Sequence, residues 1–463
     1  MSKGQENILG NMVQGEKRPT VALFNLGCKV NRYETDAVAQ QFATAGYEVV
    51  DFDSVADIYV LNTCAVTGEA GRKSGQMLRR ARKKNPAAVV AVMGCHVQLG
   101  GECSAADIVV GTQGKKRVFA AVEHFRAEWA EHNFAADARP ARLDMIQTLA
   151  LADAPDFEDF GAVDQQSETR AYIKIQDGCN NFCSYCAIPF ARGRVRSRSE
   201  ESILREGRGI AAAGFKEVVI TGIHVCSYGR DRGESSTALT SLCAKLAELP
   251  GLERIRLGSL EPLSVSAAFI EAASANPKLC PHFHLSLQSG SDTVLRRMRR
   301  RYTTENYRQV VNGLRAAYGE RLGLTTDIIV GFPGETEAEF AETVAFCREM
   351  SFTRMHIFRY SERAGTAATQ FEGKVEASVA AYRAEELAKV AAELQAAHQA
   401  RRQGKNDLVL LEQRDKEGYF EGYAPNYDPI VLGFDTSELR SGLIIPVRLI
   451  GIRNGRFIGR PLS

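Results

Sequence analysis

The chain has 463 residues, of which 44% are hydrophobic and 25% are charged, and its net charge is +2. This is the composition of a globular protein with two or three domains, and the net charge alone favours no class of partner. No apolar run reaches the roughly 18 residues that a membrane-spanning helix needs, which excludes an integral membrane protein. Residues 1–18 are polar and lack a secretory signal's apolar segment, so we expect a flexible leader and a cytoplasmic protein.

Residues 19–130 predict a parallel α/β domain. Apolar runs at 21–27, 56–63, 88–94 and 106–112 alternate with amphipathic stretches. Such runs, rich in β-branched residues and separated by helices, are typical of a parallel sheet that is covered on both faces. We expect a flavodoxin-like fold.

Three of these strands end in a cysteine. Cys28 follows the first run, Cys64 the second and Cys95 the third. Ligands of open α/β sheets bind beyond the carboxyl ends of the strands, so these thiols should converge there. The alternative is three buried cysteines without a ligand. The chain has eleven cysteines, and in a reducing compartment metal ligation, catalysis or burial explains them better than disulfides do.

Residues 131–164 are rich in Ala, Asp and Glu and predict a connector that is partly ordered at best. From 165 to 398 about six strand-and-helix units follow, with helices such as 200–213 and 337–350 between strands. This alternation predicts a partial (β/α)6 barrel, whose functional residues lie at the carboxyl ends of its strands.

A long helix rich in Ala and Glu is predicted at 375–404, and the last domain at 399–463. Its five short strands are bounded by Gly, Asn and Pro, which predicts a small antiparallel, OB-like β-barrel. After Glu438 the chain has five arginines and no carboxylate side chain. This distribution favours contacts with nucleic-acid phosphates, although a solvated face is the alternative.

The loop "QDGCNNFCSYCAIP" follows the first barrel strand and brings three cysteines together, Cys179, Cys183 and Cys186. Thiolates at C-x3-C-x2-C spacing hold three corners of a cubane iron–sulfur cluster and leave one iron open. A structural zinc site usually closes four ligands, and the loop has no fourth. Zinc ligation and simple burial remain the alternatives.

This loop, including Tyr185, resembles the signature of the radical S-adenosylmethionine (SAM) enzymes. Together with "LGCKVN", "NTCAVT", "MGCHVQ" and a terminal barrel of the TRAM type, it resembles the methylthiotransferases over nearly the whole chain. The resemblance implies two 4Fe–4S clusters, one on Cys179, Cys183 and Cys186 and one on Cys28, Cys64 and Cys95. It implies that one SAM supplies a methyl group and another a 5′-deoxyadenosyl radical. An unidentified electron donor and sulfur source would act with the enzyme, which we expect to be a monomer.

The substrate follows from finer resemblances. "GCKVN", "KIQDGCNNFCSYCAIPFARG" and "TGIHVCSYG" are similar to relatives that act on N6-threonylcarbamoyladenosine at position 37, in the tRNA anticodon stem-loop. Relatives that act on isopentenyladenosine or on a ribosomal-protein aspartate are the alternatives. A non-catalytic, metal-stabilised RNA-binding protein is a hypothesis from another class.

Weaker candidates lie at predicted strand ends and in basic segments. We expect contacts with SAM or substrate from side chains past the barrel strands, with caps and turns as the alternative; these are Tyr185, Thr221, Gly222, Glu261, Ser286, Gln288 and Asp327. We expect RNA or substrate contacts from the run "RGRVRSRS", with a salt-bridged strand as the alternative, and from the last domain. The residues are Arg192, Arg194, Arg196, Arg198, Arg448, Arg453 and Arg456. Tyr423, Asn426 and Tyr427 either contact RNA or pack in the barrel.

Overall fold

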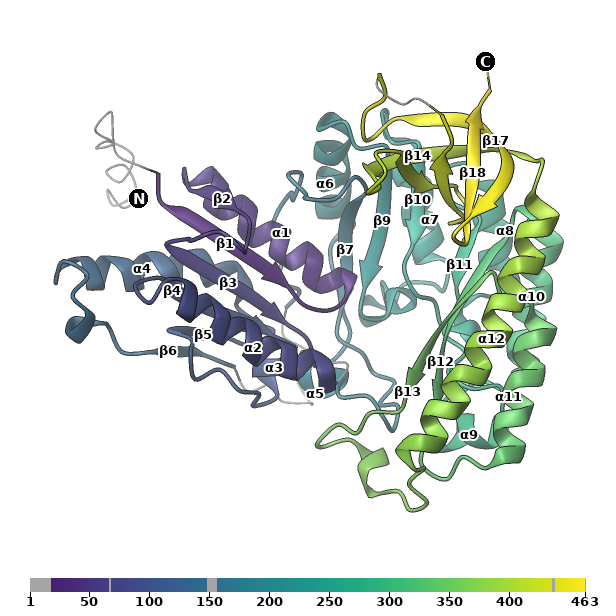
Figure 1. Ribbon diagram of the computed structural model, residues 1–463, viewed down its shortest axis with the longest axis horizontal. Coiled ribbons are helices and arrows are strands. Elements are labelled where there is room, and N and C mark those ends of the chain that lie inside the picture. The colour runs from purple at the N-terminus through teal and green to yellow at the C-terminus, as the bar shows by residue number, and fades with distance from the viewer. Residues whose placement is uncertain (1–17, 66–67, 148–155, 435–437, 463) are drawn as a thin grey trace.

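The computed structural model describes residues 18–65, 68–147, 156–434 and 438–462 and has three parts (Figure 1). A parallel sheet with its helices forms the N-terminal part, an open barrel the middle, and a small closed barrel the C-terminal part. The expected leader lies almost wholly outside the described residues. None of the helices described is long and apolar enough to cross a membrane.

The N-terminal sheet has the strand order β2-β1-β3-β4-β5-β6 and all its pairs are parallel. Every residue of β3 and β4 is buried, as expected for strands covered on both faces. The strands are β1 (Thr20–Asn25), β2 (Glu48–Val50), β3 (Ile58–Thr63), β4 (Val89–Gly94), β5 (Ile108–Val110) and β6 (Leu143–Met145). The helices are α1 (Lys29–Thr44), α2 (Gly68–Lys84), α3 (Cys95–Gln98), η1 (Lys115–Arg117), α4 (Val118–Ala130) and η2 (Ala136–Ala138).

The expected connector is part of the fold where the structure describes it. β6 extends the sheet beside β5. Farther on, Val163 is buried against Tyr33 and Ala37 of α1, and the Glu158 carboxylate accepts a hydrogen bond from the Lys116 N–H at 3.0 Å. Polar residues flank the short apolar stretches at β6 and Val163, so the composition of the segment did not predict that they are ordered. Residues 148–155 of this segment are outside the described part.

The middle part confirms the predicted partial barrel. Sheets β10-β9-β7-β8 and β11-β12-β13 are joined by single bridges such as Leu260 to Leu285. All these strands pair in parallel except the two-residue β8. The strands are β7 (Ala171–Asp177), β8 (Arg196–Ser197), β9 (Glu217–Gly222), β10 (Arg254–Leu257), β11 (His282–His284), β12 (Gly323–Val330) and β13 (Arg354–Arg359).

Helices cover the outside of this barrel (Figure 1). Two begin with capping boxes, in which Thr303 and Thr336 accept hydrogen bonds from the backbone of Asn306 and Glu339. The helices are α5 (Ile188–Arg192), α6 (Glu200–Ala212), η3 (Val225–Ser227), η4 (Arg230–Arg232), α7 (Ala238–Ala247), η5 (Pro262–Ser264), α8 (Ala267–Ala275), α9 (Asp292–Arg297), α10 (Thr304–Tyr318), η6 (Gly319–Arg321), α11 (Glu337–Met350), η7 (Ala367–Gln370) and α12 (Ala377–Arg402).

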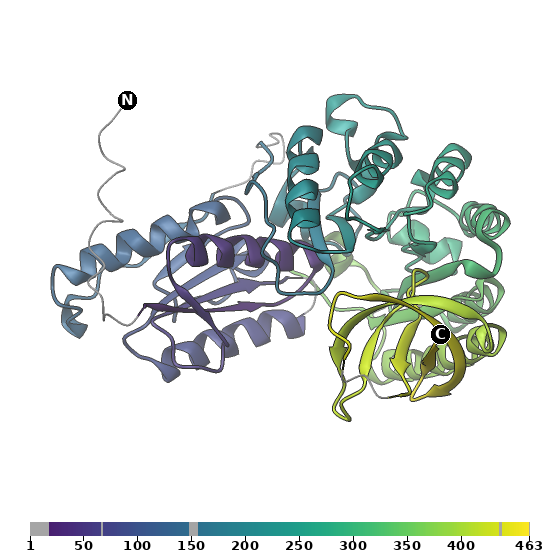
Figure 2. The same cartoon turned by 90° about the horizontal axis from the view of Figure 1, so that it is seen from above.

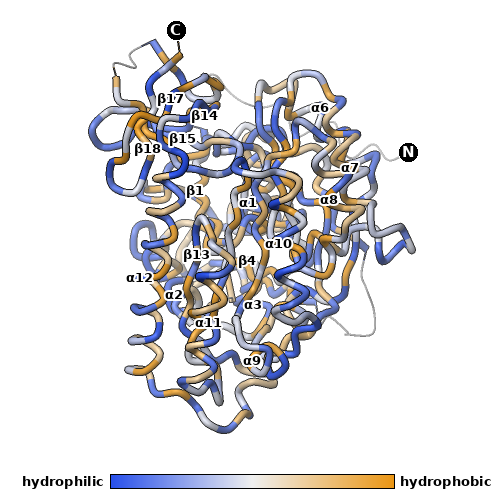
Figure 3. The backbone as a smooth tube through the Cα atoms, turned by 90° about the vertical axis from the view of Figure 1, so that its right-hand side faces the viewer, coloured by the Kyte–Doolittle hydropathy of each residue, from blue (hydrophilic) through white to orange (hydrophobic). Residues whose placement is uncertain are grey.

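Helix α12 runs along the outside of the barrel and leads into the C-terminal part (Figure 1). Hydrophobic and hydrophilic stretches alternate along it (Figure 3) because Leu387 and Val390 join the barrel core while the opposite face is solvated. The last strands close in the order β14-β15-β16-β18-β17. They are β14 (Asn406–Arg414), β15 (Phe420–Tyr423), β16 (Pro429–Leu432), β17 (Ile444–Arg453) and β18 (Arg456–Pro461).

This closed barrel confirms the predicted architecture with one difference, since β16 and β18 pair in parallel. The barrel lies over one end of the middle part (Figure 2). Its β15–β16 loop contacts β10, where Arg256 donates a hydrogen bond to the Pro425 carbonyl at 2.9 Å and Arg254 one to the Tyr423 carbonyl at 3.2 Å. The C-terminal barrel therefore contacts the amino-terminal end of the strands, and the cysteine loop lies at their carboxyl end.

Candidate functional site

The three N-terminal cysteines stand at the carboxyl ends of adjacent strands. Cys28 is the N-cap of α1 after β1, Cys64 follows β3, and Cys95 is the first residue of α3 after β4. Because β1, β3 and β4 are neighbours in the sheet, the three residues share one edge. Cys64 and Cys95 are buried and Cys28 is exposed, and none of the three is in a disulfide.

Glycines allow these loops to approach one another. Gly27 has φ +116°, and a Cβ there would lie 2.7 Å from the Cys64 Sγ. Gly94 has φ +113°, and its Cβ would lie 2.4 Å from the Thr63 carbonyl oxygen. Any larger residue at either position would clash with the neighbouring strand end and strain the backbone. The glycines before Cys28 and Cys95 therefore bring the cysteine-bearing segments together.

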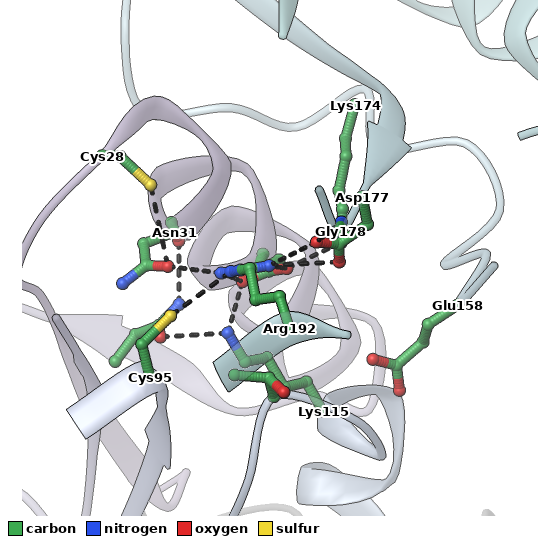
Figure 4. Close-up of polar contacts among 12 residues, drawn as sticks. Cys28, Asn31, Cys95, Lys115, Glu158, Lys174, Asp177, Gly178 and Arg192 are labelled. Atoms are coloured by element: carbon green, nitrogen blue, oxygen red, sulfur yellow. Dashed lines mark hydrogen bonds and ion pairs between the residues drawn. The ribbon is translucent and has the colours of Figure 1, made fainter. Parts of the chain in front are cut away.

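Arg192 joins this edge to the middle part of the chain (Figure 4). It is fully buried, and its Nε lies 3.3 Å from the Cys95 Sγ. One terminal nitrogen donates to the Asn31 Oδ1 at 2.7 Å, and the Cys28 Sγ lies 3.9 Å from that same oxygen. Arg192 ends α5, which begins two residues after Cys186. One guanidinium thus lies between the two cysteine sets.

Charged groups complete this buried network. Glu34 and Asp177 face Arg192 at 2.9 and 3.1 Å, Lys174 lies 2.7 Å from both carboxylates, and Lys115 pairs with Glu34. Burial opposes their ionisation, but the cations hold the pKa of Glu34 well below its usual range and lower that of Asp177. A buried network of this kind is costly to break, because removing one partner leaves an unpaired charge. It ties α1 and η1 to β7 and α5.

The second cysteine set lies on the loop after β7. Gly178 has φ +71°, and a Cβ there would lie 1.8 Å from the Arg194 carbonyl oxygen, so only glycine fits before Cys179. The Cys179 N–H donates to the Gly193 carbonyl at 3.1 Å, and Arg300 donates to the Cys183 Sγ at 3.1 Å. Beyond Cys186, helix α5 packs against α3, where Cys95, Ala65 and Ala191 form a small apolar cluster. The two sets are therefore neighbours.

The donor atoms fit iron–sulfur clusters. Burial raises the pKa of Cys28, and it raises the pKa of Cys179 to about 11 and of Cys186 to about 12. Thiolates in such places need a cationic partner, and bound iron deprotonates a coordinating thiol. Each set offers three thiols and leaves the fourth corner of a cubane open. Both sites therefore suit clusters with one iron available to another ligand.

A polar group lies beside the cysteine loop. The Glu261 carboxylate accepts from Asn181 at 3.2 Å, faces the His224 Nε2 at 3.0 Å and lies 3.6 Å from Arg300. Burial raises the pKa of Glu261, but hydrogen bonding to His224 and the charge of Arg300 outweigh this effect. The pKa of Glu261 is therefore lowered to about 2. Glu261 and Arg300 present opposite charges next to Cys183, which suits a zwitterion such as an amino acid.

The other predicted cofactor residues lie around the barrel interior. Tyr185 packs edge-on against Phe332 with ring centroids 6.4 Å apart. Thr221 is buried. A Cβ added at Gly222 would lie only 2.9 Å from the Gln176 Oε1. Gln288 has φ +69°, a strained conformation that tends to occur at functional sites. The Ser286 carbonyl accepts from Tyr302, and Asp327 lies 3.1 Å from the His284 Nε2.

The run "RGRVRSRS" does not present its arginines to one side. Arg192, Arg196 and Arg198 are buried, and Arg198 pairs with Glu206 and with Asp159. Arg194 is half-buried, with its guanidinium 4.9 Å from the Phe182 ring centroid. This corrects the expectation of RNA contacts for Arg192, Arg196 and Arg198, because α5 interrupts the extended pattern and carboxylates from α1, β7 and α6 meet these side chains. The alternative of a salt-bridged structural role describes them.

Arginines of the C-terminal barrel differ in their partners. Arg448 and Arg460 are exposed and stand opposite each other on β17 and β18. Arg453 lies 3.1 Å from Glu417, and Arg456 pairs with Glu421. Like charges directly opposite each other disfavour the pair unless an anion lies between them. Arg448 and Arg460 are thus the arginines of this barrel best placed to meet a phosphate.

Sequence reasoning missed the residues that join the two sites. Asn31, Glu34, Lys115 and Lys174 look like ordinary helix and strand positions, and no motif spacing singles them out. Arg300 lies in the basic cluster "RRMRRRY", which reads equally well as a solvated face. The one signal was the charge of Lys174 within the otherwise apolar stretch "AYIKI", since charged residues are rarely buried without a partner.

Comparisons with known proteins show the family to which the chain belongs. The profile of the radical SAM superfamily matches residues 173–347, and that of an uncharacterised family, UPF0004, matches residues 20–111. The chain is 40% identical to threonylcarbamoyladenosine tRNA methylthiotransferase MtaB of Bacillus subtilis, with 93% of this chain and 94% of the relative covered. The chain belongs to the radical SAM tRNA methylthiotransferase family. Membership makes it an enzyme of the transferase class and implies a 4Fe–4S cluster and SAM.

More distant relatives in this family carry a second name. The chain is 32% identical to a tRNA-2-methylthio-N(6)-dimethylallyladenosine synthase of Symbiobacterium thermophilum, with 95% of this chain and 94% of the relative covered. Among solved structures, the radical SAM methyltransferase TsrM of Kitasatospora setae, with tryptophan and a SAM analogue bound, superposes with a TM-score of 0.50 at 14% identity. It covers 73% of this chain and 72% of its own, and supports the fold alone. Family membership excludes the non-catalytic alternative.

Proposed function

We propose that this methylthiotransferase replaces the C2 hydrogen of N6-threonylcarbamoyladenosine at position 37 of tRNA with a methylthio group. The observation that carries the proposal is the contact of α5 with α3, which places two sets of three cysteines next to each other in a chain that is 40% identical to an MtaB protein. The reaction uses two SAM molecules, one as methyl donor and one as radical source.

In this proposal the six cysteines hold two clusters. Cys179, Cys183 and Cys186 hold the cluster that cleaves SAM, and Cys28, Cys64 and Cys95 hold the one that carries the sulfur. When bound, these groups supply a 5′-deoxyadenosyl radical and a sulfur atom for transfer. Radical chemistry needs a site that excludes water and fixes its reactants. The buried network around Arg192 meets that need by fixing one cysteine set against the other.

Polar groups of the barrel rim hold SAM. Glu261 and Arg300 bind its amino and carboxylate groups, because their charges are complementary and both lie beside Cys183. Gln288, which lies four residues beyond β11 and has a strained backbone, borders the same space as Thr221 and Gly222, the last two residues of β9. Tyr185 packs beneath the loop, and Ser286 and Asp327 face the substrate.

RNA docks on the C-terminal barrel. Arg448, Arg453, Arg456 and Arg460 contact phosphates of the anticodon stem-loop, and Arg448 and Arg460 contribute most because no carboxylate of the described residues pairs with them. The enzyme works as a cytoplasmic monomer with an external electron donor and sulfur source. Its parts are a leader at 1–18, a cluster domain at 19–130, a linker at 131–164, the radical core at 165–398 and the TRAM barrel at 399–463.

Nucleoside analysis tests the substrate. A strain that lacks its own tRNA methylthiotransferases is complemented with this chain, and its tRNA is digested for mass spectrometry. We expect the 2-methylthio form of N6-threonylcarbamoyladenosine to appear, and the Cys183→Ala variant to yield none. Appearance of the 2-methylthio form of isopentenyladenosine alone would instead support the function named for the dimethylallyladenosine synthases.

A further inference from the structure

An aromatic column lies where the C-terminal barrel meets the middle part. Tyr427 stacks between Tyr423, at 4.6 Å and 16°, and His282, at 4.7 Å and 22°. Its φ of +72° is strained for a tyrosine, so the surrounding structure holds it in place. Three guanidinium groups surround its ring, with distances to the centroid of 5.2 Å for Arg170, 4.9 Å for Arg256 and 5.8 Å for Arg354.

Carboxylates neutralise only part of this positive charge. Arg170 lies 2.6 Å from Glu412, and Arg256 lies 2.6 Å from Glu217. Asp327, on the neighbouring strand, is 3.1 Å from His284. Each of these carboxylates thus has its own partner, and none of them pairs with Arg354.

Lys29 is a second unpaired cation in the same place. It is the first residue of α1, which packs against β7 and β9, and its electrostatic neighbours are Tyr427, Arg170, Arg256 and Asp327. Within the part of the chain that the structure describes, the side chains of Lys29 and Arg354 have neither a hydrogen bond nor an ion pair. Arg354 and His356 share one face of β13, and His356 stands opposite Asp327.

Both cations border a space that water reaches. Cys28, Lys29 and His356 are exposed and Arg354 is half-buried. Because Lys29 begins the helix that packs against β7 and β9, and His356 stands opposite Asp327 of β12, we interpret the space that these residues share as a chamber between α1, β12 and β13. Cys28 opens onto it directly beside Lys29.

We propose that Lys29 and Arg354 bind the carboxylate on the N6 substituent of the substrate adenosine. This inference rests on the proposed function, which supplies a substrate with a carboxylate on that substituent. C2 and C6 of an adenine are separated only by N1, so an adenine whose C2 faces the Cys28 cluster carries its N6 substituent to the side, within reach of the groups beside Cys28. There, two cations without counter-ions and a stacked tyrosine meet a planar, anionic group. An uncharged isopentenyl group would leave both cations unpaired and desolvated, which disfavours it.

The test compares RNAs that differ only in this carboxylate. Three anticodon stem-loops carry threonylcarbamoyl, its methyl ester or isopentenyl on N6 of the same adenosine. The reconstituted enzyme is measured for binding, for KM and kcat of methylthio transfer, and for 5′-deoxyadenosine release without RNA. The variants are Lys29→Gln and Arg354→Gln, with Lys389→Gln, an exposed cation of α12, as the matched control.

We expect the wild type to prefer the acid to the ester, and each chamber variant to lose about ten- to a hundredfold in affinity for the acid alone. The acid-to-ester ratio then falls toward one, while RNA-free cleavage of SAM and the melting temperature stay unchanged. Equal wild-type affinity for acid and ester, or an unchanged ratio in both variants, overturns this binding site alone. A wild type that modifies only the isopentenyl RNA overturns the proposed function and the site with it.

Discussion

The two cysteine sets differ in how much of the fold each needs. Cys179, Cys183 and Cys186 lie within eight residues on one loop, whose shape depends on Gly178 and the Gly193 carbonyl. Cys28, Cys64 and Cys95 come from three strand ends and meet only because β1, β3 and β4 are neighbours in the sheet. The first set is formed by one loop, whereas the second is formed only when three strands take neighbouring places in the sheet.

This contrast also shows where the sets depend on each other. Arg192 follows the loop set by six residues and contacts Cys95 of the sheet set. The loop set is held by groups of the middle part of the chain, the Gly193 carbonyl and Arg300, but the sheet set receives a charged neighbour from outside its own part. A substitution in the sheet set should therefore leave the loop set intact, whereas a substitution of Arg192 should affect both sets.

The largest effect should come from the loop set. Cys183→Ala removes one of three thiolates that a cluster needs, so we expect loss of both SAM cleavage and methylthio transfer. The measurement is 5′-deoxyadenosine formed with dithionite, beside a Cys243→Ala control in a buried position away from both sets. Wild-type cleavage by Cys183→Ala would show that this thiol does not hold the radical cluster.

Cys64→Ala should separate the two activities. It leaves the loop after β7 intact, so SAM cleavage should persist within about twofold, while methylthio transfer is lost because the sheet set keeps only two thiols. Both products can be quantified from one reaction by mass spectrometry. If methylthiolated RNA still forms, Cys64 is not a ligand of the sulfur-carrying cluster.

Arg192→Gln should couple the sets. Glu34 and Asp177 would lose a buried cation, which costs about 3–5 kcal/mol of stability in such networks. We expect a lower melting temperature and a greater loss of transfer than of SAM cleavage, since Cys95 also loses its neighbour. Arg205→Gln, which removes an exposed pair with Glu201, is the matched control. An unchanged melting temperature for Arg192→Gln would contradict the bridging role.

The smallest effect should come from the C-terminal barrel, on which we propose that RNA docks. Replacing Arg448 and Arg460 together with Gln should weaken stem-loop binding and reduce the slope of log affinity against log salt by about 1.5. Arg453 and Arg456, already paired with carboxylates, should change it less. SAM cleavage without RNA should be the same in both double variants. A larger slope change from the Arg453 pair would reverse our ranking of the phosphate contacts.

The sequence predicted most of the architecture, because the apolar runs and turn residues of each part are strong local signals. Helix 337–350 begins and ends as predicted, since Thr336 caps it and Ser351 in a left-handed conformation ends it. The short strands β2 and β6 were missed because three residues carry too little pattern. Local spacing suggested that the "RGRVRSRS" arginines face one way, but their partners come from α1, β7 and α6, which only the three-dimensional fold brings there.

The iron content of two triple variants tests the central claim that each cysteine set holds its own cluster. After anaerobic reconstitution the wild type should hold about eight iron atoms, and the variant with Cys28, Cys64 and Cys95 all changed to Ala about four. That variant should still cleave SAM, while the one lacking Cys179, Cys183 and Cys186 should retain about four irons without cleavage. A wild type with four irons, or a sheet-set variant that cannot cleave SAM, would contradict the account.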